Sequence, residues 1–242
     1  MTRGILIAGN ESTLYHAIAA EAAKRVEHFA SALIPSRQIE LLRIPTEEKK
    51  QDSGKTSFDQ SVSGAASSKQ AAIALQWNPG SPISARTLVI AAENRLDKIN
   101  EAILVCVPPS VRRPAAELTL TDIETLVNDH IKGWLYLARE LSMVFRERKA
   151  GTLALAYYET GTGESKDDPM DTLGPSALAS FQAFSRSLLA AAHDEPYLTM
   201  GFSCAGAGAE TGFASHVFKF LDEENRRNNG KLHKYGRLNF LK

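Results

Sequence analysis

Short apolar runs with the character of buried strands alternate with longer amphipathic runs along almost the whole chain. The expected strands cover residues 4–8, 39–44, 71–75, 102–107, 152–158, 197–203 and 237–241, and the expected helices cover residues 14–33, 86–99, 122–148, 176–193 and 212–224. Strands that are apolar on both sides are typical of a parallel sheet with helices on both faces. The sequence therefore predicts a doubly wound α/β fold, with a seven-stranded, mostly parallel sheet in a three-layer sandwich.

The length of 242 residues suits one domain of this kind, and we expect residues 1–242 to form it. Residues 46–70 contain almost no large apolar side chains, so we expect an exposed, flexible excursion after the second strand. The clearest helix is 122–148, in which apolar residues such as Trp134 and Leu141 recur every three or four positions. Thr121 followed by Glu124 predicts a capping box at its start.

Composition excludes several classes of function. The 28 basic and 28 acidic residues balance and form no long run of one sign, which argues against a nucleic-acid partner. No apolar stretch approaches the roughly 20 residues of a membrane span, and the run at residues 5–8 is too short for the core of a signal peptide. Cys106 and Cys204 are too few for a disulfide framework, and no Cys/His group has zinc spacing. We therefore expect a cytoplasmic protein without a metal ion.

Four local phrases, in the right order, resemble the short-chain dehydrogenase/reductase family. Residues 8–19 are similar to its Thr-Gly-x-x-x-Gly-x-Gly-x-Ala-x-Ala turn, and residues 95–99 to its Gly-x-Leu-Asp-x-Leu. Residues 131–134 resemble the central helix after the structural asparagine of the family, and residues 184–188 the end of the helix with its catalytic Tyr and Lys. The resemblance covers nearly the whole chain and implies a Rossmann-like fold.

The first turn departs from the family pattern. In this fold the turn binds a pyrophosphate through backbone N–H groups at a helix N-terminus, and glycines let that backbone approach closely. Gly9 is present, but Thr13 and Tyr15 stand where the resemblance places the second and third glycines. The phenol of Tyr15 would crowd the phosphate or the helix–strand contact, and the carboxylate of Glu11 would repel a diphosphate. We expect a structural turn, and keep a modified nucleotide site as the alternative.

If a nucleotide binds, the resemblance assigns it to a cleft made by Gly9, Asn10, Ser12, Thr13, Arg43 and Asn78. Arg43 ends the second expected strand, where the family selects the adenosine ribose, and a basic residue there suggests the 2′-phosphate of NADP. Asn78 lies near the usual adenine-contacting aspartate. Both residues also suit an ordinary solvated loop. We therefore expect no cofactor, with NADP or NAD as the alternative.

The catalytic residues of the family are all replaced. Its members use a Tyr acid/base, a Lys four residues later on the same helix face, a Ser and an Asn. Alignment through residues 184–188 puts Gly174 at the tyrosine, Leu178 at the lysine, His130 at the asparagine and Tyr158 at the serine. No Tyr-x-x-x-Lys occurs anywhere in the chain, whatever the alignment.

Two functions remain in competition. The first is a degenerate homologue of the family without its redox activity, acting as a scaffold, a partner-binding protein or a sensor of a small ligand in the old cleft. The second is an atypical NAD(P)(H)-dependent oxidoreductase with a site rebuilt from His130, Tyr157 and Tyr158. The short connection at residues 205–211 leaves little room for the usual substrate lid, which favours the first.

Assembly is a further implication of the resemblance. Members of the family usually dimerise through the helices equivalent to 122–148 and 176–193, and often form tetramers. Trp134, Leu141, Phe181 and Phe184 supply apolar surface on these two helices. We therefore expect a homodimer or homotetramer through them.

Overall fold

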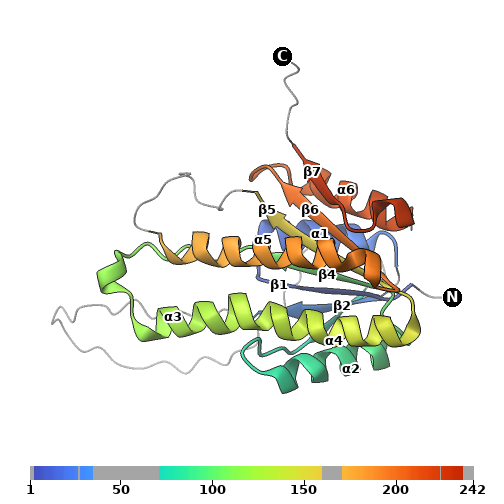
Figure 1. Ribbon diagram of the computed structural model, residues 1–242, viewed down its shortest axis with the longest axis horizontal. Coiled ribbons are helices and arrows are strands. Elements are labelled where there is room, and N and C mark those ends of the chain that lie inside the picture. Colours follow the sequence, from blue (N-terminus) through green and yellow to red (C-terminus); the bar gives the residue numbers. More distant parts are fainter. Residues whose placement is uncertain (1–2, 27, 35–70, 160–170, 224, 237–242) are drawn as a thin grey trace, which may run out of the picture.

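The computed structural model describes residues 3–26, 28–34, 71–159, 171–223 and 225–236, and these form one parallel sheet of seven strands in the order β3-β2-β1-β4-β5-β6-β7 (Figure 1). The strands are β1 (Ile5–Gly9), β2 (His28–Leu33), β3 (Ala71–Leu75), β4 (Glu101–Cys106), β5 (Thr152–Tyr158), β6 (Leu198–Cys204) and β7 (Leu232–Tyr235). Every neighbouring pair is parallel. The strand order reverses its direction between β1 and β4, so the sheet is doubly wound as predicted.

Helices cover both faces of the sheet. Helices α2 (Pro82–Leu96), α4 (Gly133–Arg148) and α5 (Leu173–Ala191) lie side by side over one face, and α1 (Thr13–Ala23) and α6 (Glu210–Asp222) pack together over the other (Figure 1). Alternate residues of each strand enter the two cores: Leu6 and Ala8 of β1 face α2 and α4, whereas Ile5 and Ile7 face α1 and α6. The three-layer sandwich is confirmed.

The position of the second strand was predicted wrongly. It spans His28–Leu33, which the sequence assigned to a helix at 14–33, and α1 ends at Ala23. This stretch is rich in alanine, the best helix former, and that misled the assignment. Parallel pairing with β1 overrides the propensity, with Leu6 opposite Ala30 and Ala8 opposite Ala32. The strands expected at 39–44 and 237–241, and the excursion at 46–70, lie outside the described residues.

The helix predicted at 122–148 is interrupted. Helix α3 (Leu120–Val127) is followed by a π-helical turn, η2 (Asn128–Lys132), and only then by α4. The capping box is formed by Thr119 and Asp122 rather than by Thr121 and Glu124, because the helix begins earlier than expected. Burial opposes ionisation of Asp122, but hydrogen bonds from Thr119 and the charge of Arg113 outweigh it and lower the pKa of this carboxyl. The acid therefore fixes the start of α3.

An aromatic cluster fills the core between the sheet, α4 and α5. Trp134 packs against Trp77, with ring centroids 5.5 Å apart, and against Phe181 at 5.3 Å. Trp134, Leu141 and Phe181 are each at most 1% exposed, so the prediction that they offer a surface to a partner is wrong. Their helical stripes face the sheet, and only Phe184 of the predicted four is partly exposed.

Candidate functional site

The candidate site lies at the carboxyl ends of β1 and β4, where the sheet order reverses and where α1 begins. Ser12 adopts an extended backbone and caps α1: its hydroxyl oxygen accepts a hydrogen bond from the Tyr15 amide at 3.1 Å. A free amide at this helix end is what a phosphate group would bind. Ser12 therefore takes up a donor that the nucleotide turn normally offers to its ligand.

Tyr15 is a core residue beneath this turn. Its side chain is 2% exposed, and its hydroxyl lies 2.6 Å from the Ser31 hydroxyl on β2. A Cβ added to Gly9 would lie 2.8 Å from the Tyr15 ring and 2.8 Å from the carbonyl oxygen of Val105. Gly9 is thus needed for the close approach of Tyr15 and β4 to β1, and the phenol joins α1 to β2. Burial raises the pKa of Tyr15, and the bond to Ser31 only partly opposes this.

A hydrogen-bonded group closes the space between the N-termini of α1 and α6, which we call the mouth of the site. Tyr158, at the end of β5, donates to Glu210 Oε1 at 2.6 Å, and Thr13 of α1 donates to the same oxygen at 3.3 Å. The other carboxylate oxygen accepts the Gly208 amide at 2.9 Å. We call Thr13, Tyr158 and Glu210 the mouth triad. It joins the N-termini of two helices to the end of a central strand.

The protonation states within the mouth triad follow from these contacts. Burial, and then the bond to Glu210, raise the pKa of Tyr158 well above its ordinary value. Burial opposes ionisation of Glu210, but the bond from Tyr158 and the backbone amides outweigh it and lower its pKa. At neutral pH a neutral phenol therefore donates to a charged carboxylate.

The residues of this mouth do not fit the diphosphate of a nicotinamide dinucleotide. The backbone amides of Tyr15 and Gly208 are bonded to the side chains of Ser12 and Glu210, and the Glu210 carboxylate stands beside the start of α1. Like charges at short range repel, so a diphosphate would have to displace this carboxylate. Glu11 adds a second, mostly exposed carboxylate to the same turn, 4.0 Å from His16. The side-chain oxygen of Asn10 is shielded from solvent and has no hydrogen-bond partner among the described residues.

The three residues considered for a rebuilt catalytic site do not share one face of the sheet. Tyr158 belongs to the core under α1 and α6, whereas its neighbour Tyr157 belongs to the opposite core, where it packs against Phe181 at 5.9 Å. His130 lies in η2, which contacts α3, α4 and α5. The alternation of side chains along β5 separates the two tyrosines.

The side chains that the sequence resemblance aligned with the catalytic residues of the family are buried. Leu178 is buried in the core with Phe181. A Cβ on Gly174 would lie 2.9 Å from the Pro109 carbonyl oxygen and 2.9 Å from Asp171, so no larger side chain fits there without a shift. His130 is 3% exposed, and burial lowers its pKa to about 4.

A hollow of about 450 Å³ lies at the carboxyl ends of β2 and β3. It is lined by Ser31, Leu33, Ala74, Leu75, Gln76, Trp77, Asn78 and Ser84. Asn78, predicted near the adenine, is placed here, and its backbone N–H donates to the Ser84 hydroxyl at 2.8 Å. Arg43 lies outside the described residues.

Sequence reasoning missed Glu210, because nothing local links it to Tyr158, 52 residues earlier.

In the described part of the chain, no group of three or more His, Cys, Asp or Glu side chains is gathered for a metal ion. No helix within the same residues is long and apolar enough to cross a membrane.

The sheet order, its reversal between β1 and β4, and helices on both faces define a Rossmann-type fold. Within that class, the chain has the fold of the short-chain dehydrogenases/reductases. It is similar to a short chain dehydrogenase from Mycobacterium smegmatis, with 10% identity, a TM-score of 0.69, and coverage of 98% of this chain and 92% of that one. It is also similar to serine dehydrogenase from Escherichia coli, with 13% identity, a TM-score of 0.65 and coverage of 96% of both chains.

A third similar structure is levodione reductase, with 13% identity, a TM-score of 0.63, and coverage of 96% of this chain and 95% of that one. No protein-family model matches the sequence, and no curated protein matches it. The likeness is therefore one of fold, and the chemistry of this chain has to be argued from its own residues.

Proposed function

We propose that this chain uses the short-chain dehydrogenase/reductase fold as a binding protein without the redox reaction of that family. The mouth triad carries the proposal, because Glu210 places a hydrogen-bonded carboxylate where a nicotinamide dinucleotide would need a phosphate site. Tyr15 supports it, since a buried ring takes the place of a glycine in the turn. Both features stabilise the empty fold and disfavour the dinucleotide.

The competing function is an oxidoreductase with a rebuilt site, and proton transfer weighs against it. A catalytic acid or base needs a pKa near the working pH. The pKa of Tyr158 is raised rather than lowered, and its proton is held by Glu210. His130 is buried on the other side of the sheet and neutral at pH 7. Neither group is prepared to exchange a proton with a carbonyl substrate.

The hollow at β2 and β3 is the place we propose for a small ligand. Its volume of about 450 Å³ lies within the roughly 300–1,000 Å³ typical of ligand pockets. Its described lining contains one indole, two amides and two hydroxyls but no charged side chain, which suits a compact neutral ligand. Ser31 belongs to this lining and its hydroxyl pairs with that of Tyr15, so a ligand here would lie one hydrogen bond away from the residue that fills the turn.

Two broader parts of the proposal concern where the protein works and with what. A cytoplasmic location is supported by the free, buried cysteines Cys106 and Cys204, which fit a reducing compartment. Scaffolding or partner binding is the natural use of a fold whose cleft is closed by its own side chains. Assembly as a homodimer or homotetramer would be one form of it.

A titration with nicotinamide cofactors tests the proposal. We expect no saturable heat with NAD, NADH, NADP or NADPH up to millimolar concentration, and no rise in the melting temperature, because binding only the folded state would raise it. We also expect no consumption of NADPH or NADH with a panel of carbonyl compounds. Glu210→Gln serves as the matched variant, since it removes the charge and keeps the shape. Saturable binding together with turnover by the natural protein would contradict the proposal.

A further inference from the structure

A row of aromatic rings joins helix α6 to the edge strand β7. Within the described residues β7 pairs only with β6, and it lies at the edge of the sheet beside α6 (Figure 1). The row is made of rings from three neighbouring elements: Phe202 of β6, Phe213, His216 and Phe220 of α6, and His233 and Tyr235 of β7. Two of these rings are imidazoles, which become charged when they bind a proton.

Both imidazoles are packed between other rings of the row. The ring centroid of His233 lies 3.9 Å from that of Phe220 and 5.4 Å from that of Phe202. The ring of His216 lies 4.9 Å from Phe220 and 5.3 Å from Tyr235. The Nε2 atom of each imidazole is shielded from solvent and has no hydrogen-bond partner among the described residues. A proton added at either Nε2 would therefore make a buried donor without an acceptor, which is unfavourable.

The surroundings of both imidazoles disfavour a second charge of the same sign. Burial, and then the charge of Lys219, lower the pKa of His216. Burial lowers the pKa of His233 as well, and the neighbouring His216 and Lys231 add to this effect. Because each imidazole lowers the pKa of a ring beside it when charged, protonation of the first makes protonation of the second harder.

Few groups compensate a proton on this pair. A hydrogen bond to the backbone of Asn228 and the charge of Glu223 favour protonation of His233, but burial outweighs them. Lys234 belongs to the other face of β7, where it pairs with Glu159 at 3.7 Å. The row of rings therefore holds two neutral imidazoles at neutral pH.

The side chains of β7 that contact α6 belong to this row. His233 and Tyr235 are two residues apart, so they lie on the same face of the strand, against α6. A Cβ added to Gly212 of α6 would collide with the Tyr235 hydroxyl, so this ring lies directly on the helix backbone. Leu232 packs into the core on the opposite face of the sheet. A change that opens the row therefore removes the contact of β7 with α6.

We propose that His216 and His233 form a pH-sensitive latch, which holds β7 on α6 and β6 while both imidazoles are neutral and releases β7 when they bind protons. A released β7 returns both rings to water, where an imidazole has a pKa of roughly 6.5. The docked state binds protons more weakly, so it is favoured above this value and loses its advantage as the pH falls below it. Release takes up two protons, so it depends more steeply on pH than release controlled by one histidine.

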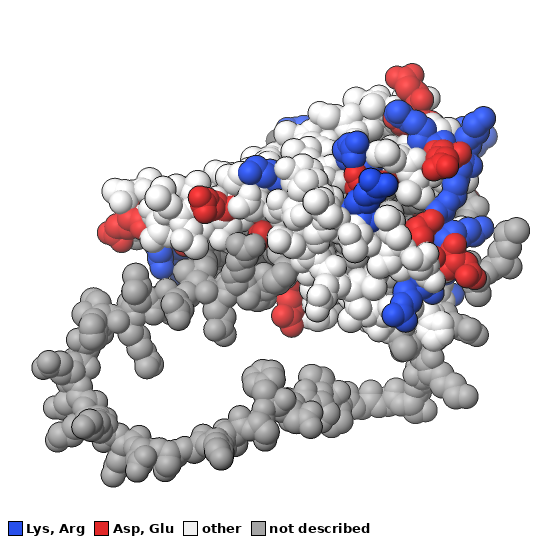
Figure 2. All heavy atoms as spheres, turned by 90° about the horizontal axis from the view of Figure 1, so that it is seen from below, with Lys and Arg blue, Asp and Glu red and all other residues white. Residues whose placement is uncertain are grey.

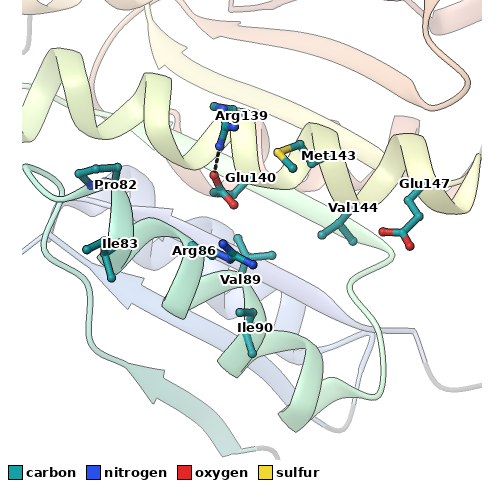
Figure 3. Close-up of a pocket in the computed structure, with 10 residues that line it drawn as sticks. All are labelled: Pro82, Ile83, Arg86, Val89, Ile90, Arg139, Glu140, Met143, Val144 and Glu147. Atoms are coloured by element: carbon teal, nitrogen blue, oxygen red, sulfur yellow. Dashed lines mark hydrogen bonds and ion pairs between the residues drawn. The ribbon is translucent and has the colours of Figure 1, made fainter.

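The contact between α2 and α4, on the opposite face of the sheet, is a reference without imidazoles. Figure 3 shows apolar side chains of both helices around a hollow of about 450 Å³, and none of the described residues that line it is a histidine. Figure 2 views the molecule from the side on which α2 lies, and acidic and basic side chains are intermixed there. These groups titrate outside the range of imidazole. Helices α2 and α4 should therefore stay docked at a pH that releases β7.

Amide hydrogen exchange of the full chain, followed by NMR, tests the latch. The Ala205 amide donates to the Tyr235 carbonyl at 3.0 Å, so it reports whether β7 is docked. The Leu198 amide donates to the Gly151 carbonyl at 2.9 Å, on the other side of β6, and is the internal control. After correction for the intrinsic rate, the protection factor of Ala205 should fall at least about tenfold from about pH 7.5 to about pH 5.5, the effect of one pKa unit. The protection of Leu198 and of the α4 amides should not follow it.

The double variant His216→Phe/His233→Phe isolates the two imidazoles. It keeps a ring at both positions but cannot bind a proton, so Ala205 should remain protected at the lower pH. His16→Gln is the matched control, because it removes an exposed histidine of α1, and it should respond like the natural protein. An equal loss of protection in the natural protein and the double variant, or no loss in the natural protein, would overturn the proposal.

Titration of the imidazole signals by NMR gives a second readout that needs no folded variant. In the natural protein, His216 and His233 should both titrate below the ordinary value, and their titration should coincide with the loss of protection at Ala205. Titration at the ordinary value, or exchange at Ala205 that does not follow it, would contradict the latch. Neither measurement involves a nicotinamide cofactor, so cofactor binding would refute the proposed function and leave the latch standing.

Discussion

Replacing Tyr15 with alanine will lower the free energy of unfolding by about 3–5 kcal/mol, the usual loss for a large buried aromatic side chain. The ring fills the space between Gly9, α1 and β2, so the variant leaves a cavity that neighbouring backbone cannot close. If Tyr15 contributed nothing to the packing of the core, its replacement by alanine would lower the free energy of unfolding far less. Urea denaturation at neutral pH measures the difference.

Tyr15→Phe is the matched control for this experiment. It keeps the ring and removes only the hydroxyl that pairs with Ser31 at 2.6 Å, so we expect a loss of about 1 kcal/mol. Calorimetry on Tyr15→Ala should still detect no dinucleotide, since Glu210 remains in place. A stable Tyr15→Ala protein that binds NADH would show that Tyr15 is a plug rather than part of the core.

Acidification from about pH 7 to about pH 5 will cost the fold about 2 kcal/mol through His130 alone. Its pKa is about 4 in the folded protein, against roughly 6.5 in an unfolded chain. Between these values the unfolded state binds the extra proton, so stability falls as the pH drops through this window and levels off below it. The contribution of His130 to the stability is fully present above the pKa that it has in the unfolded chain.

The variant His130→Gln isolates this contribution. His216 and His233 also have pKa values lowered by burial and contribute in the same window, so the test is the difference between natural protein and variant. The lowered pKa values of Asp122 and Glu210 act in a more acidic range, where carboxylates titrate. Denaturation curves at the two pH values should show a smaller loss in the variant. Equal losses in both proteins would mean that His130 is not buried as neutral imidazole.

The fold could be predicted from sequence because most of its strands are continuous apolar runs. Residues 71–75 and 152–158 match β3 and β5 at both ends. The second strand could not be found, because its alanines favour a helix locally and only pairing with β1 makes it a strand. The π-helical turn could not be predicted from the sequence either, since the apolar spacing continues from α3 into α4 without a visible break.

The candidate site was only partly accessible to the same reasoning. The sequence identified the turn and the bulk of Tyr15, because both follow from local residue types. It offered no reason to pair Tyr158 with Glu210, which come together only through the packing of β5 beside α6. It also left open whether Tyr158 and His130 could meet, and that depends on which face of the sheet each residue takes.

The π-helical turn between α3 and α4 also changes how this chain should be compared with others. Such a turn holds one residue more than an α-helical turn, and one residue corresponds to a rotation of about 100° around the helix axis. Upstream of it, Leu126 packs with Leu173 and Ala177 of α5, whereas downstream the stripe containing Trp134 and Leu141 faces the sheet. Against a chain whose corresponding helix is continuous, an alignment without a gap shifts every upstream position by one residue. Equivalence between His130 and a residue of another chain therefore has to be established by superposition.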